Sequence, residues 1–230
     1  MKPEKILPKR ISRALEEYEL IAEGDRVILA LSGGKDSLAM AWFMGRMASC
    51  WIRPFTVEAV HVRAPWEGEA LADGIGQICA DWALPYREIP LLQTDLKEPE
   101  EMCCSHCARL RRQALLSYAS REGFQSLALG HHMEDCLETF LMNMVYQSRL
   151  DPLPPRRDYP GIKLIRPLIL AQEETVARWA LEKGLNLPEA NCPWESVDSR
   201  RKEMRAHLEA ITDGSAAKKL NMFRAALALV

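Results

Sequence analysis

The feature that most constrains the fold is an apolar run that ends in a glycine pair and continues as a helix. Residues 26–32, RVILALS, have the continuous apolar character of a strand buried on both faces. A glycine pair follows at 33–34, and residues 36–49 have the apolar spacing of a helix. A strand that passes through a tight turn into a helix is typical of a βαβ unit and predicts a parallel sheet.

The same alternation continues along the chain. Further strands are predicted at 55–62, 86–90, 126–131 and 162–169. Further helices are predicted at 9–22, 67–83, 105–122, 137–145 and 173–183, and from 198 onward. We therefore expect an α/β fold, a parallel sheet with helices on both faces. Residues 1–230 are expected to form a single domain with a short helical C-terminal segment at about 198–230, and the proline-rich residues 150–161 a stiff surface loop or a substrate-facing flap.

Composition excludes several classes of protein. No segment approaches the roughly 18–20 apolar residues that cross a bilayer, and MKPEKILPKR has no signal-peptide core, so we expect a cytoplasmic protein without a membrane partner. Seven cysteines in such a chain argue against a disulfide framework. Cys50, Cys79 and Cys136 stand alone in apolar surroundings and are expected in the core.

The turn after the first strand has the chemistry of an anion site. The glycines at 33–34 let a ligand approach the backbone, and the helix that follows presents free N–H groups. Lys35 adds a positive charge, and Ser32 and Ser37 add hydroxyl donors. Asp36 fits a phosphate site if Mg²⁺ bridges it to the ligand. The alternative is an ordinary helix start at which Asp36 complements the helix dipole.

A second group of residues combines cysteines with arginines at 103–112, CCSHCARLRR. Cys104 and Cys107 have the spacing of a metal or redox pair. A zinc knuckle would need a second close pair, and Cys192 is instead a single later cysteine in a polar context. Three cysteine ligands would leave a cubane cluster with one iron open. Cys103 is either a spectator or a substitute ligand.

Two resemblances give these patterns a function. SGGKDS after an apolar strand resembles the PP-loop of the ATP pyrophosphatases, which cleave ATP between its α and β phosphates. CSHCARLRR, LALGHHMEDCLETFLMN, IRPL and a late cysteine resemble, in that order, the tRNA 2-thiocytidine synthetase family over about residues 20–212. In that family ATP activates the C2 oxygen of a cytidine in tRNA, and sulfur carried by a three-cysteine [4Fe-4S] cluster displaces AMP.

The resemblance implies a role for individual residues. The nucleotide-binding residues it implies are Ala30, Leu31, Ser32, Gly33, Gly34, Lys35, Asp36, Ser37, Gly130 and Asp135. The cluster ligands it implies are Cys104, Cys107 and Cys192. The catalytic residues it implies are Lys35, Asp36, Asp135 and Arg111, with Arg111 near the phosphates. The implied cofactors are ATP, Mg²⁺ and a [4Fe-4S] cluster. The implied partners are tRNA and a sulfur donor such as a cysteine desulfurase, and a homodimer is left open.

Alternatives stay open beside this hypothesis. Asp135 could serve only a helix N-terminus, and His131 and His132 could be structural. The net charge of −2 is low for an RNA-binding protein, although basic stretches occur at 103–112, 149–166 and 200–205. The runner-up is a PP-loop thiolase or ligase that acts on a small molecule or another RNA. A third hypothesis is a nucleotide-binding cluster sensor without turnover.

Overall fold

The computed structural model describes residues 2–91, 104–185, 187 and 199–229. Within this part of the chain the backbone forms one six-stranded sheet in the order β3-β2-β1-β4-β6-β5. The strands are β1 (Arg26–Leu31), β2 (Thr56–Arg63), β3 (Tyr86–Pro90), β4 (Ser126–Ala128), β5 (Arg156–Tyr159) and β6 (Ile162–Ile165). All neighbouring pairs are parallel except β5 and β6, which are antiparallel.

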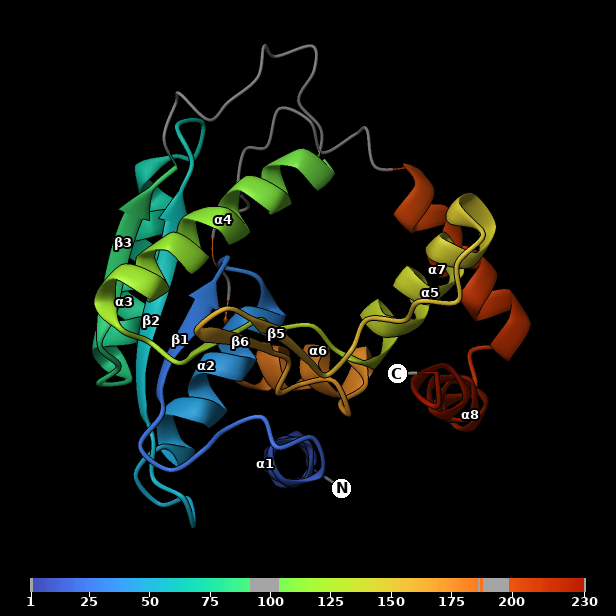
Figure 1. Ribbon diagram of the computed structural model, residues 1–230, viewed down its shortest axis with the longest axis horizontal. Helices are drawn as coiled ribbons and strands as arrows, with labels where there is room; N and C mark the ends of the chain where they lie inside the picture. Colours follow the sequence, from blue (N-terminus) through green and yellow to red (C-terminus); the bar gives the residue numbers. More distant parts are fainter. Residues whose placement is uncertain (1, 92–103, 186, 188–198, 230) are drawn as a thin grey trace.

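Eight helices surround this sheet in the described residues. They are α1 (Pro3–Glu17), α2 (Lys35–Met47), α3 (Glu69–Asp81), α4 (Cys104–Glu122), α5 (Met133–Gln147), α6 (Glu173–Glu182), α7 (Ser199–Thr212) and α8 (Ala216–Leu227). Figure 1 shows α4 along one face of the sheet and α5, α7 and α8 grouped together beyond it. No helix in the described part has both the length and the hydrophobicity that a bilayer crossing requires.

Strand β1 divides the apolar interior into two cores. Val27, Leu29 and Leu31 belong to the larger core, which includes side chains from α1, α2, α3, α5 and α6. Ile28 belongs to the smaller core under α4. Alternate side chains of a strand point to opposite faces, so a strand that is apolar at nearly every position is covered on both sides. The continuous apolar run is therefore explained by burial of β1 on both faces, as the sequence predicted.

The α/β fold with a parallel sheet and C-terminal helices is confirmed, with one correction. The segment expected as a loop or flap at 150–161 contains β5, which pairs antiparallel with β6 and forms one edge of the sheet. Gly161, with φ +77°, allows the tight reversal between these two strands. Adjacent strands joined by so short a turn can only be antiparallel.

Several expected boundaries were wrong. The first helix is Pro3–Glu17 and not 9–22. It begins earlier than expected because Pro3 is well suited to the first helical position. Strand β6 ends at Ile165, because Arg166 enters a turn in which its carbonyl accepts from the N–H of Ile169. Strand β4 likewise ends at Ala128. Gly123 and Gly184 end α4 and α6 with positive φ, as predicted.

Two expectations about burial also needed correction. Cys79 and Cys136 are buried, as predicted, but Cys50 is exposed after α2. The apolar residues at 137, 140, 141, 144 and 145 recur with helical spacing and predict one buried face, but Met144 and Val145 are 43% and 57% exposed. The last turn of α5 extends beyond the sheet, and no described residue buries its apolar side chains.

Candidate functional site

A pocket lies where the order of the sheet reverses. Strands β1 and β4 are adjacent and parallel, and the chain leaves β1 toward β2 on one side and β4 toward β6 on the other. Ligands bind at such switch points, beyond the carboxyl ends of the strands. Here a cavity of about 310 Å³ lies between the end of β1, the start of α2, the end of β4 and the inner side of α4.

Most residues predicted for the nucleotide line this cavity. They are Ala30, Leu31, Ser32, Gly34, Asp36, Ser37, Gly130 and Asp135. Gly33 and Lys35 are not among the described lining residues. Gly33 has φ +82° and faces α3, where a Cβ would approach a methyl carbon of Leu71 to 2.8 Å. Its role in the turn is therefore conformational.

The two serines of the turn hold its shape. The Ser37 hydroxyl donates to the carbonyl of Gly34 at 2.9 Å and accepts from the N–H of Ser32 at 3.2 Å. The N–H of Gly34 donates to the Ser32 hydroxyl at 3.3 Å. Sequence reasoning treated both hydroxyls as free donors, whereas here they hold the turn. What the turn then offers an anion is the N-terminus of α2.

Lys35 and Asp36 are tied into a network of charges. Lys35 Nζ lies 3.0 Å from Asp36 Oδ2 and 3.0 Å from Glu173 Oε1 at the start of α6. The other carboxylate oxygen of Asp36 is buried and has no hydrogen-bond partner among the described residues. Burial raises the pKa of Asp36, although His132 and Lys35 oppose that shift. An unpartnered buried carboxylate oxygen at an anion site fits a divalent cation.

Gly130 brings the end of β4 into close contact with α2. A Cβ at this position would lie 2.9 Å from the backbone nitrogen of Ser37 and 3.0 Å from the carbonyl carbon of Asp36. Any side chain would therefore push apart the two segments that form the pocket floor. The requirement for glycine is steric, since Gly130 is not among the residues with positive φ.

Asp135 serves the N-terminus of α5 and also faces the pocket. Its Oδ2 accepts from the N–H of His132 at 2.9 Å, so the structural alternative for this residue is confirmed as one of its roles. Its other oxygen is paired with Arg201 of α7. Burial raises the pKa of Asp135, but the charges of His132 and Arg201 outweigh burial and lower it. His132 is buried with Nε2 3.4 Å from Asp135 Oδ2.

The C-terminal helix α7 closes this network with two arginines. Arg201 Nε and Arg205 Nε bind the two oxygens of the buried Glu138 at 2.9 and 2.8 Å. Arg205 also approaches Glu173 to 3.5 Å, the carboxylate that holds Lys35. Helix α7 is thereby connected through ion pairs to the first residue of α2. Sequence reasoning missed Glu138 and Glu173, because no local motif marks a carboxylate whose partner is more than 60 residues away.

Arg111 belongs to a second network, on the other side of the pocket. Its Nη2 binds Glu67 Oε1 at 2.7 Å, its Nη1 donates to the carbonyl of Val62 at 3.2 Å, and its Nε lies 3.4 Å from the Cys107 sulfur. Glu67 in turn lies 3.2 Å from Nε2 of the buried His61. Arg111 lines the cavity as predicted, but its described partners are a carboxylate, a carbonyl and a thiol.

Glu67 is the centre of this second network and is buried. Burial alone would raise its pKa, but the adjacent His61 ring and hydrogen bonds from the N–H of Ala64 and from Arg111 lower it to about 2. The ring of His61 contacts the carbonyl of Leu31 at 2.9 Å. A continuous set of contacts therefore joins the residue before the glycine turn to the cysteine on α4.

The predicted cluster ligands are only partly within the described residues. Cys104 is the first residue of α4 and Cys107 lies one turn later, buried. Cys192 lies outside the described residues. In the described part no group of three or more His, Cys, Asp or Glu side chains could hold a metal. Two thiolates one turn apart on a helix suit an iron–sulfur cluster, whose usual ligands are cysteines. The same helix lines the nucleotide pocket through Ala108 and Arg111.

The comparison with known proteins agrees with this geometry. Residues 3–208 match a family described as the PP-loop domain. The chain belongs to the PP-loop family. It is 30% identical over 213 residues to the tRNA-cytidine(32) 2-sulfurtransferase of Coxiella burnetii, covering 90% of this chain and 82% of the relative. It is 32% identical over 212 residues to the protein of the same name from Tolumonas auensis, covering 90% of this chain and 70% of the relative.

Solved structures confirm the fold. The U34-tRNA thiolase of Methanococcus maripaludis, solved with its [4Fe-4S] cluster, aligns with a TM-score of 0.82 and 23% identity over 99% of this chain and 79% of its own. The NMN synthetase of Francisella tularensis aligns with a TM-score of 0.56 and 16% identity over 99% and 93% of the two chains. The PP-loop architecture is therefore shared with proteins of different activity, and the fold alone does not select the acceptor.

Proposed function

We propose that this protein is an ATP-dependent tRNA sulfurtransferase that forms 2-thiocytidine. The observation that carries the proposal is that one helix, α4, both presents Cys104 and Cys107 and lines the pocket at the PP-loop. Chemistry at the cysteines and chemistry at the nucleotide thus take place on the same structural element. The similarity to proteins named tRNA-cytidine(32) 2-sulfurtransferase supports this acceptor.

The first half-reaction is assigned to the PP-loop side of the pocket. The N-terminus of α2 and Lys35 would bind the phosphates of ATP, and Asp36 with Asp135 would hold Mg²⁺ against them. The C2 oxygen of cytidine would attack the α phosphate, the bond to the β phosphate would break, and pyrophosphate would leave. The apolar wall of Ala30, Leu31 and Val62 suits the adenine ring.

The second half-reaction is assigned to the α4 side. A [4Fe-4S] cluster held by Cys104, Cys107 and Cys192 would supply an iron site at which sulfur is delivered. Arg111 would orient Cys107 through its Nε and carry positive charge toward the leaving AMP, since it lines the pocket and also contacts the thiol. Glu67 and the Val62 carbonyl would fix the guanidinium in that position.

The remaining parts of the proposal concern the protein's surroundings. The sulfur donor is a protein such as a cysteine desulfurase, the assembly is a homodimer, and the reaction takes place in the cytoplasm, where cysteines stay reduced. We also propose that residues 1–230 act as one domain, because α7 is tied by ion pairs to α5 and α6.

Mass spectrometry of tRNA nucleosides tests the function. We expect 2-thiocytidine in cells that express the wild type or Cys50→Ser, and its loss in cells without the gene or with Cys107→Ser. Cys50 is the matched control because it is an exposed cysteine that does not line the pocket. If cells without the gene keep their 2-thiocytidine, the acceptor is another molecule and the small-molecule alternative takes its place.

A further inference from the structure

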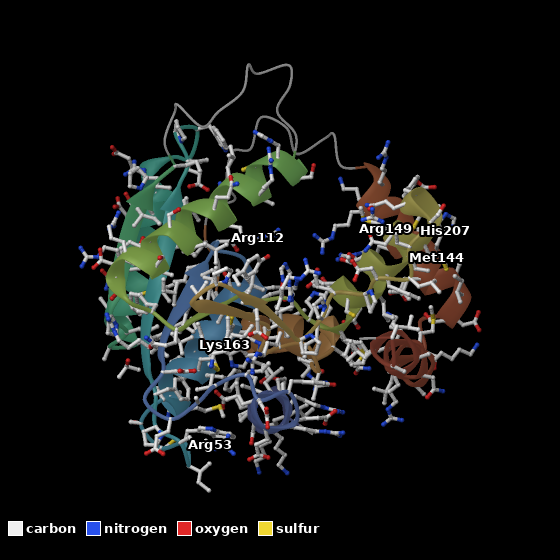
Figure 2. All side chains as sticks on the ribbon, in the orientation of Figure 1. Arg53, Arg112, Met144, Arg149, Lys163 and His207 are labelled. Carbon is white, nitrogen blue, oxygen red and sulfur yellow. The ribbon has the colours of Figure 1, made fainter. Side chains whose placement is uncertain are left out.

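Two neighbouring arginines of α4 have opposite surroundings. Arg111 is bound by a carboxylate, a carbonyl and a thiol. Arg112 also lines the pocket but has no ion pair or hydrogen bond to any other described residue. Figure 2 shows Arg112 on the side of α4 that faces the sheet. A guanidinium in a pocket without a carboxylate partner is a binding group for an anion.

Arg166 is almost fully buried and contacts His131, which lines the same pocket as Arg112. It is 3% exposed, its Nη1 donates to the carbonyl of Pro154 at 2.5 Å, and its Nε donates to Nδ1 of His131 at 3.3 Å. Its backbone N–H donates to the carbonyl of Pro155 at 2.9 Å, so it also fixes the start of β5. Burial, with the charges of Arg157 and Arg112, lowers the pKa of Arg166 to about 10. The contacts of Arg166 thus connect the pocket, through His131, to the start of β5, two residues before Arg157.

His131 adds a neutral donor beside them. Burial, with the positive charges of Arg166, Arg201 and Arg112, outweighs the opposing charge of Asp135 and lowers the pKa of His131 to about 4. Its Nδ1 accepts from Arg166, so the proton of the neutral ring sits on Nε2. His131 lines the pocket, where an N–H donor can meet a phosphate or base oxygen.

Arg157 carries the positive charge out to the edge of the sheet. Strand β5 is the outermost strand on this side. Tyr159, two residues later on the same face, packs against the core under α4, so Arg157 lies on the α4 side. Arg156 and Asp158 lie on the opposite face, where they pair at 2.9 Å. Arg157 is exposed and has no partner among the described residues.

We propose that Arg112 and Arg157 form a cationic track that binds the phosphodiester backbone of the acceptor RNA, and that the buried charge of Arg166 adds to the positive potential there. The proposal rests on the proposed function and locates the RNA on the α4 face of β5 and β6. The phosphates of a mononucleotide such as ATP are assigned to the PP-loop and do not need these arginines. A row of cations that leaves the pocket and reaches the outermost strand suits a polymer with a phosphate on every unit. Arginines that lack carboxylate partners repel one another, and a bound polyanion relieves that repulsion.

The experiment compares adjacent residues of one strand. Protein reconstituted without oxygen is titrated against an unmodified tRNA transcript over a range of KCl concentrations, and its affinity for ATP is measured separately. Arg157→Gln and Arg112→Gln should each weaken tRNA binding several-fold and each reduce the slope of log K against log salt by about 0.7–0.9. Arg156→Gln, on the other face of β5, and Arg53→Gln, which lies far from Arg112 in Figure 2, should leave the slope unchanged.

The outcomes separate this proposal from the function on which it rests. If the wild type binds no tRNA at any salt concentration, the proposed RNA acceptor fails. If the wild type binds tRNA and Arg156→Gln alters the slope as much as Arg157→Gln, binding does not depend on the α4 face and the track is wrong. If Arg157→Gln or Arg112→Gln weakens ATP binding and leaves the tRNA slope intact, the phosphate belongs to the nucleotide and the track is again overturned.

Discussion

The two sides of the pocket treat positive charge in opposite ways. On the PP-loop side, Lys35, Arg201 and Arg205 each pair with two carboxylates. Lys35 pairs with Asp36 and Glu173, Arg201 with Asp135 and Glu138, and Arg205 with Glu138 and Glu173. On the side of β5 and β6, Arg112 and Arg157 have no carboxylate partner among the described residues. The pairs of Arg201 and Arg205 fix the positions of α5, α6 and α7, whereas unpaired cations remain fully available to an incoming anion.

This difference separates two uses of the same residue type. An arginine that satisfies a buried carboxylate maintains the structure, because removing either partner leaves the other uncompensated. An arginine without such a partner contributes little to folding and can bind a ligand phosphate. Arg111 and Arg112 are neighbours in the sequence, yet Arg111 pairs with a carboxylate and Arg112 lines the pocket without one. The following changes, in order of expected effect, test the paired side.

The largest effect is expected from Asp36→Asn. The substitution removes the charge that would hold Mg²⁺ and keeps the shape, so AMP and pyrophosphate formation should fall by roughly 1,000-fold or more, since a bound divalent cation contributes several kcal/mol of charge stabilisation. Release of AMP is measured beside thermal unfolding, which should change little. Asp73→Asn removes an exposed carboxylate from α3 and serves as the control. Wild-type AMP release from folded Asp36→Asn would remove Asp36 from the mechanism.

A smaller effect, on stability, is expected from Glu67→Gln. The pKa of Glu67 is lowered from 4.5 to about 2 in the folded protein. Its contribution to stability is therefore complete above pH 4.5 and is lost as the pH falls toward 2, and it is on the order of 3 kcal/mol at pH 7. Denaturant unfolding should show the wild type and Glu67→Gln far apart at pH 7 and converging below pH 4. If the unfolding free energies of the two proteins change in parallel with pH across that range, the charge of Glu67 does not contribute to stability.

The smallest effect is expected from Glu138→Gln. Glu138 is fully buried and binds Arg201 and Arg205, whose side chains are nearly half exposed. Because water can solvate the released arginines, the loss of unfolding free energy should be about 1–3 kcal/mol. Glu203→Gln alters an exposed carboxylate of α7 that accepts from the Tyr146 hydroxyl at the surface, and it should change the unfolding free energy less than Glu138→Gln does. Equal stability of Glu138→Gln and the wild type would show that the ion pairs of Glu138 do not hold α7 in place.

Local patterns in the sequence predicted much of this protein. The strand, the glycine turn and the helix at 26–49 are determined locally, because burial on both faces requires a continuous apolar strand and the turn requires glycine at Gly33. The parallel sheet follows from the alternation of strands and helices. The gathering of Asp36, Gly130 and Asp135 at one pocket also follows, since parallel strands bring their carboxyl ends to one edge.

Other features were decided only by the tertiary structure. The strand at 156–159 has a charged, unremarkable sequence, and it is a strand only because β6 offers an unpaired edge. The carboxylate partners Glu67, Glu138 and Glu173 lie far along the chain from Arg111, Arg201 and Lys35, and no local spacing connects them. Whether a given arginine is paired or free depends on which carboxylates the fold brings within about 4 Å, because charge interactions in the interior are strong at contact distance and weaken as separation grows. The sequence by itself determines which charges the chain carries and which segments are buried, and only the packing of distant elements decides which charges neutralise one another.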